Sequence, residues 1–180
     1  MSERPAKSRP TWSDVKAKLD GFDRKGLLGL VRDLYDAHKD NQRFLHTRFG
    51  LGGDVLEPYR QIIERWISPD VVRDQRPSVA KAKQAISDYK KAGGDPASLV
   101  ELMVFYCELA ADFCTSYGED DAPYLNTLVN MFEDALLVAR TLPSESRDAF
   151  RLRLAKVRDV CNNMGYGVGD AMEDMLAECP

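Results

Sequence analysis

The strongest pattern in the chain lies at residues 95–117, where apolar residues cover most of the circumference of a predicted helix. At 100° per residue they form two adjacent stripes that span roughly 220°, far beyond the ~100° stripe of a surface helix. One stripe contains Leu99, Leu102, Met103, Tyr106, Leu109, Ala110, Phe113 and Tyr117, and the other contains Val100, Val104, Cys107, Ala111 and Cys114. We therefore expect a central helix with neighbours on more than one side. Its polar remainder is a narrow strip of Glu101, Glu108 and Asp112.

Similar periodicities predict further helices on both sides of the central one. Capping residues, prolines in first turns and glycines after last turns mark their ends. The predicted ranges are 13–19, 23–38, 41–49, 55–67, 78–91, 121–141, 144–162 and 171–177. No segment combines strict alternation with β-branched residues, so strands are not expected. The sequence predicts an all-α fold, a single-domain array of about eight helices packed as antiparallel helical hairpins around the helix near 95–117.

The two N-terminal helices carry apolar stripes of their own. Val15 and Leu19 are expected to face inward from the first. The second has an apolar face at helical spacing, formed by Leu27, Leu30, Val31, Leu34, Tyr35 and His38. Gly26 and Gly29 weaken this helix by roughly 1 kcal/mol each relative to alanine. We interpret both glycines as sites where a neighbouring helix approaches closely, although two weak helix positions would give the same pattern.

Length and hydropathy point to one globular unit. The 180 residues are enough for one domain with a sizeable core. Residues 1–10 are basic and contain prolines, so we expect a disordered tail followed by a single helical domain over 11–180. The mean hydropathy of −0.40 and the lack of a long apolar run argue against a membrane span. Because residues 1–10 hold no apolar signal core, a cytoplasmic location is expected.

Charge is unevenly distributed along the chain. Residues 1–91 hold 19 Lys/Arg and 13 Asp/Glu, whereas residues 92–140 hold one basic and nine acidic residues. Two explanations stay open: an acidic face for a basic partner, or two halves that attract each other within one fold. The isoelectric point of about 5.3 argues against nucleic-acid binding. The four cysteines form no CxxC pair, and there are only two histidines, so the sequence predicts neither a metal nor a cofactor.

The polar strip of the central helix is the first candidate for chemistry. Glu101, Glu108 and Asp112 share one face, as a carboxylate metal or small-ligand site would require. The Glu-x-x-His motif of di-metal helical bundles is missing, because Tyr35 and Arg43 precede His38 and His46 by three residues. The other interpretation is a strip that is solvated or paired with basic residues of neighbouring helices, for which the candidates are Arg60, Arg65, Lys81 and Lys83.

Two further groups complete the candidates. His38 and His46 could join the carboxylate strip, and His46 could also transfer protons or bind an anion, although a histidine flanked by Phe44 and Phe49 is more often a partly buried structural residue. Glu119, Asp120 and Asp121 concentrate negative charge before a helix, where they either cap it or form an acidic contact surface.

Several stretches resemble a bacterial family known only as a domain of unknown function. The resemblance lies in residues 34–49, 102–106 and 117–132 and in the Lys-rich helix predicted at 78–91, and it covers most of the chain. It implies a small, all-helical intracellular protein and brings no activity with it, so no site residue follows from it.

Together these observations predict a cytoplasmic helical protein that acts as a protein–protein interaction or adaptor module, and they favour a non-enzymatic role. Its expected partner is a second protein or another copy of the chain. Glu119, Asp120 and Asp121 are the first contact surface to test. The alternative is a metal- or small-ligand-dependent enzyme or sensor that uses the carboxylate strip.

Overall fold

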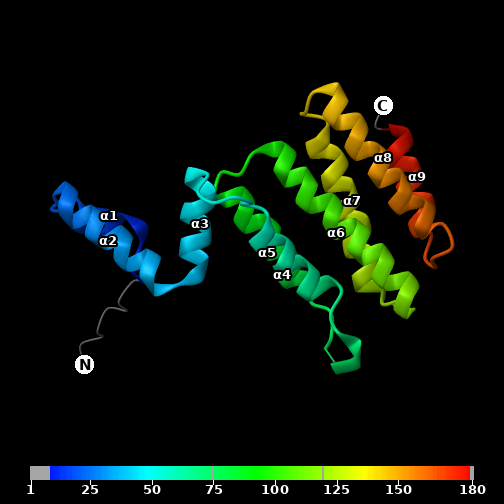
Figure 1. Ribbon diagram of the computed structural model, residues 1–180, viewed down its shortest axis with the longest axis horizontal. Coiled ribbons are helices and arrows are strands. Elements are labelled where there is room, and N and C mark those ends of the chain that lie inside the picture. Colours follow the sequence, from blue (N-terminus) through cyan, green and yellow to red (C-terminus); the bar gives the residue numbers. More distant parts are fainter. Residues whose placement is uncertain (1–8, 74, 119, 179–180) are drawn as a thin grey trace, which may run out of the picture. The chain divides into compact units, whose positions relative to one another are not determined.

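The structure is a computed structural model of the chain, and it describes residues 9–73, 75–118 and 120–178. Over these residues it is all-helical, as predicted. The helices are α1 (Trp12–Leu19), α2 (Arg24–Ala37), α3 (Lys39–Phe49), α4 (Glu57–Ile67), the 3-10 helix η1 (Val71–Arg73), α5 (Val79–Lys91), α6 (Pro96–Tyr117), α7 (Ala122–Ala139), α8 (Ser144–Cys161) and α9 (Val168–Glu178) (Figure 1).

The chain divides into two compact units, residues 1–42 and residues 43–180, which we call the N-terminal unit and the body. The sequence analysis instead places one domain over 11–180. Most of the predicted tail at 1–10 lies outside the described residues. Among the described helices none has both the length and the apolar character needed to cross a bilayer.

Local hydrogen bonds fix the ends of the N-terminal helices. The backbone N–H of Thr11 donates to the carboxylate of Asp14 at 2.7 Å and so starts α1. The Asp23 carboxylate accepts from the N–H of Gly26 at 2.7 Å and caps α2, as its position in the sequence predicts. At the other end of α2, the Asn41 amide donates to the Leu34 carbonyl at 2.6 Å. These bonds define two regular helices without giving either one a packed face.

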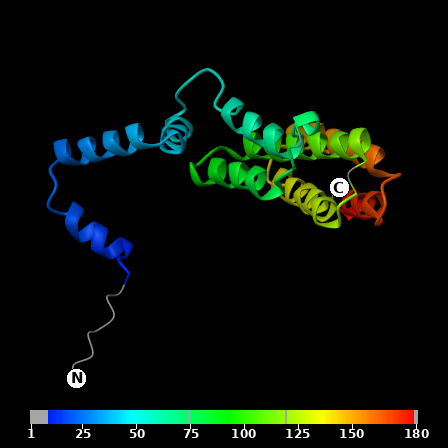
Figure 2. The same ribbon diagram turned by 90° about the horizontal axis from the view of Figure 1, so that it is seen from below.

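The N-terminal unit corrects two predictions of the sequence analysis. Neither α1 nor α2 has a buried residue, and Val15, expected to face inward, is exposed. Within the N-terminal unit no second helix approaches the glycines of α2. A Cβ at Gly29 would meet nothing within 4 Å, and one at Gly26 would lie nearest to Phe22 and Asp23. The two helices also make little contact with each other and diverge in Figure 2.

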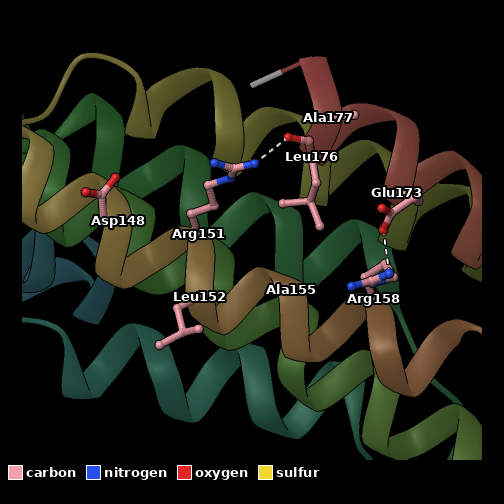
Figure 3. Close-up of a pocket in the computed structure, with 8 residues that line it drawn as sticks. All are labelled: Asp148, Arg151, Leu152, Ala155, Arg158, Glu173, Leu176 and Ala177. Carbon is pink, nitrogen blue, oxygen red and sulfur yellow. Dashed lines mark hydrogen bonds and ion pairs between the residues drawn. The ribbon is translucent and has the colours of Figure 1, made fainter. Parts of the chain in front are cut away.

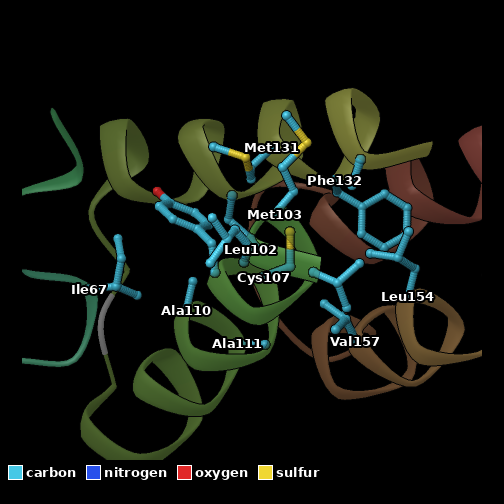
Figure 4. Close-up of a cluster of buried hydrophobic side chains, with 14 of the residues drawn as sticks. Ile67, Leu102, Met103, Cys107, Ala110, Ala111, Met131, Phe132, Leu154 and Val157 are labelled. Carbon is cyan, nitrogen blue, oxygen red and sulfur yellow. The ribbon is translucent and has the colours of Figure 1, made fainter. Parts of the chain in front are cut away.

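The body is organised around α6, as the breadth of its apolar arc predicts. This helix packs against α4, α5, α7 and α8, and Figure 1 shows it between the α4–α5 pair and the α7–α9 helices. Half of its residues are buried, and Figure 4 shows Met103, Cys107 and Ala111 of α6 among Met131 and Phe132 of α7 and two side chains of α8. Tyr117 departs from the predicted stripe: it is exposed, because α6 ends there.

The α5–α6 turn shows why two consecutive glycines are needed. Gly93 has a φ of +81°, which residues with a side chain rarely adopt. A Cβ on Gly94 would lie 2.1 Å from the ring of Tyr89. That ring packs edge-on against Tyr59 with centroids 5.2 Å apart, and its hydroxyl donates to Asp95 at 3.1 Å. Asp95 in turn caps α6 by accepting from the N–H of Ser98 at 2.9 Å. The turn therefore fixes the start of the central helix.

Candidate functional site

The carboxylate strip of α6 is paired with one arginine from α8. The Arg153 guanidinium donates to Glu101 through Nη1 at 2.6 Å and Nη2 at 3.1 Å. The same group donates to Glu108 through Nε and Nη2, both at 2.8 Å. Since Glu101 and Glu108 stand two helical turns apart, one planar guanidinium bridges both. Four charge-assisted hydrogen bonds thus join α6 to α8.

The electrostatics of this cluster follow from its partial burial. The side chains of Arg153, Glu101 and Glu108 are 31%, 26% and 36% exposed. Hydrogen bonding to Glu108, partly offset by desolvation and supported by Glu101, raises the pKa of Arg153 above its ordinary value. Arg153 therefore keeps its proton at any working pH, and the cluster carries a formal charge of −1 when both carboxyl groups are ionised.

Arg153 is not among the basic residues that the sequence analysis names as candidate partners of the carboxylate strip. Two of those named residues contact other groups. Lys81 sits over the ring of Trp66, with its Nζ 3.7 Å from the ring centroid. Arg60 pairs with Asp54 at 2.9 Å. Arg153 adjoins Leu154, which the periodicity of α8 places inward, but nothing in the sequence says that α8 packs on α6.

Asp112, the third residue of the strip, lines a groove between α6 and α8. The groove has a volume of about 330 Å³, and its polar lining comes from Asp112, Lys156, Glu108 and Arg153. The guanidinium donors of Arg153 already bond to carboxylates, so the groove offers a ligand one exposed carboxylate and one exposed ammonium group. It has no enclosed polar chamber in which a reaction could be shielded from water.

The two histidines lie in different units of the chain. His38 belongs to the N-terminal unit, where its Nδ1 lies 3.2 Å from the carboxylate of Asp40. His46 lies in α3 of the body and is partly buried. Over residues 9–73, 75–118 and 120–178, no three His, Cys, Asp or Glu side chains are arranged to hold a metal ion.

The acidic turn before α7 has a structural role at one position. Asp121 accepts from the N–H of Tyr124 at 3.2 Å and caps α7. Asp120 is exposed and lines a cavity of about 240 Å³ at the end of α6. Glu119 lies outside the described residues. A charge reversal that includes Asp121 would therefore weaken α7 as well as change a surface.

A second pocket, between α8 and α9, was not expected from the sequence. It has a volume of about 410 Å³ and appears in Figure 3 with its lining side chains. Arg151 donates to the Leu176 carbonyl at 2.8 Å, and Arg158 forms an ion pair with Glu173. These arginines attach α9 to α8, where the first also satisfies a carbonyl in the last turn of α9. The pocket is thus lined by groups that already have structural partners.

The N-terminal unit presents a feature of a different kind, an apolar surface with no cover inside the unit. Seven large apolar side chains on α1, on α2 and in the turn between them are between 41% and 69% exposed. They are Trp12, Val15, Phe22, Leu27, Leu28, Val31 and Leu34. We call this set the N-terminal apolar surface. Leu27, Val31 and Leu34 share one face of α2, and an exposed apolar face of this kind often marks an interaction site.

Comparisons with protein-family models, with curated proteins and with solved structures find no match to this chain. The resemblance to a bacterial family of unknown function therefore stays a prediction.

Proposed function

We propose that the protein is a protein–protein interaction module whose contact site is the N-terminal apolar surface. The observation that carries the proposal is that α1 and α2 are regular, capped helices with clear apolar stripes and no buried residue. An apolar stripe of a helix normally becomes buried, because each fully buried leucine or valine contributes about 1.5–3 kcal/mol.

The body shows what such stripes do when a partner is present. On α4, Tyr59, Ile63 and Ile67 follow the same helical spacing, and each is at most 1% exposed. The stripe of α2 with Leu27, Val31 and Leu34 has comparable side chains at comparable spacing but no helix over it within its unit. By this comparison, the N-terminal apolar surface has the composition and helical spacing of a face that packs on another helix, which supports the proposal.

The alternative function, a metal- or ligand-dependent enzyme or sensor on the carboxylate strip, receives less support. Glu101 and Glu108 direct their oxygens at Arg153, so metal binding would have to break four short hydrogen bonds. The acidic contact surface at 119–121 is also less suited, because Asp121 is committed to capping α7.

Site-specific photo-crosslinking in cells that make the protein would test this function. A benzophenone amino acid at Leu34 should form an adduct with a protein, because Leu34 lies in the apolar stripe of α2. The matched control carries the same group at Lys25, on the polar face of the same helix. If neither Leu34 nor Val31 gives a protein adduct above the level of Lys25, the proposed function is wrong.

A further inference from the structure

We infer that the protein bound at the N-terminal apolar surface is a second copy of the same chain, which pairs through α1 and α2 to form a homodimer. This inference rests on the proposed function and names the partner. Three observations support it: the lack of a core in the N-terminal unit, the area of its apolar surface and its charge balance.

The N-terminal unit cannot be stabilised by its own contacts. It spans 42 residues, and its described helices have no buried side chain. Chains of about this length usually need a disulfide, a metal or oligomerisation to stay folded. The described part of the unit has no cysteine and only one histidine, so burial of its apolar side chains against a further surface is the remaining source of stability.

The exposed area suits a stable symmetric interface. An aromatic side chain presents roughly 150–250 Å² when fully exposed, and a leucine or valine presents about 150 Å² or less. The exposed fractions of the seven residues of the N-terminal apolar surface then correspond to at most roughly 500–650 Å² per chain. Two copies would bury at most on the order of 1,000–1,300 Å², at the lower end of the range of specific protein interfaces.

The body offers no comparable surface. Its exposed large apolar residues are spread over separate elements, and no described helix of the body exposes more than two. On α8, for example, Leu152 and Val160 are eight positions apart and Tyr166 follows in a loop. Phe44, Phe49 and Leu51 form a smaller exposed apolar group, and no such group in the described part of the body has as many members as the set on α1 and α2.

Charge favours the same partner over an oppositely charged one. Residues 9–42 hold seven basic and six acidic side chains, a net of +1. Such a balanced surface neither attracts an anionic membrane strongly nor repels its own copy. Contact between two copies is therefore dominated by apolar burial, which screening by salt does not weaken.

Sedimentation equilibrium of the purified full-length chain tests the inference. We expect a mass twice the 20.3 kDa of one chain, unchanged between about 0.1 and 1 M salt. In the double variant Val31→Asp and Leu34→Asp, both copies of the chain place the new carboxylates in the interface, because the dimer is symmetric. The Kd of the dimer should therefore rise by about 100-fold or more. The control is Leu152→Asp, an exposed leucine of the body, which should leave the dimer intact.

Each other outcome overturns the inference and bears separately on the proposed function. A monomer that still crosslinks from Leu34 to a different protein in cells keeps the function and excludes the second copy. A monomer whose Leu34 crosslink is to its own body excludes both. A monomer that instead binds vesicles of anionic lipid, with loss of binding at high salt, assigns the surface to a membrane. A dimer that persists in the double variant places the interface elsewhere.

Discussion

Replacement of Arg153 by methionine should be the most damaging single change on the partly exposed face of the body. Methionine keeps much of the apolar stem but removes all four hydrogen bonds to Glu101 and Glu108. The two carboxylates are then left side by side without a cation. Breaking a fully buried ion pair costs about 3–5 kcal/mol, and breaking an exposed pair costs about 0–1 kcal/mol. With side chains about one-third exposed, we expect a loss of about 2–3 kcal/mol.

Urea unfolding of the full-length chain would measure this loss of free energy, and thermal unfolding would measure the matching fall in Tm. For a chain of this size 1 kcal/mol corresponds to roughly 2–4 °C, so the Tm should fall by roughly 4–12 °C. The matched control is Arg73→Met, since Arg73 pairs with Asp70 at 3.2 Å but is 78% exposed. That control should change the free energy of unfolding by less than about 0.5 kcal/mol.

A triple variant separates charge from packing at the same site. When Arg153→Met is combined with Glu101→Gln and Glu108→Gln, no ionised carboxylate is left unpaired, and most of the lost stability should return. If Arg153→Met costs no more than Arg73→Met, the cluster does not hold α6 and α8 together. If the triple variant is as unstable as the single one, the loss comes from packing, and the electrostatic reasoning is refuted.

Three further predictions concern buried groups and a tight turn in the body. Tyr106→Phe should be neutral or stabilise the chain by up to about 1 kcal/mol, because the buried Tyr106 hydroxyl has no hydrogen-bond partner. Tyr124→Phe should cost about 1 kcal/mol, because the Tyr124 hydroxyl donates to the Ile67 carbonyl at 2.9 Å. Equal effects of the two variants in thermal unfolding would contradict this contrast. Gly94→Ala should lower the Tm strongly, since its Cβ would lie 2.1 Å from an aromatic ring, and Gly53→Ala, with open space around it, should not. Burial raises the pKa of Cys161 from 9.0 to about 11, so the folded state favours the neutral thiol and loses stability as pH rises from about 9 to 11. Cys161→Ala should reduce this loss of stability. If the free energy of unfolding depends on pH in the same way in the variant, this explanation is wrong.

Sequence reasoning was most successful where local chemistry decides the outcome. The predicted helix ranges begin at Asp23, Asp95 and Asp121, and each of these carboxylates accepts a backbone hydrogen bond that caps its helix. The central position of α6 followed from the width of its apolar arc. The pairing of its polar strip could not be found in this way, because many basic residues lie on other helices and only the packing of α8 on α6 selects Arg153.

The sequence predicts where the helices lie and that α6 dominates, because these depend on neighbours within a few residues and on the period of the apolar pattern. It does not predict every cap, since α1 is capped by Thr11 and Ser78 makes no side-chain cap bond. Which stripes are covered follows from the packing of distant helices. The stripes of α4 and α2 have similar spacing, but Ile63 is fully buried while Val31 is exposed. Burial depends on what lies opposite a helix, and a local pattern does not contain that information. This difference in cover is the observation on which the proposed interaction function rests.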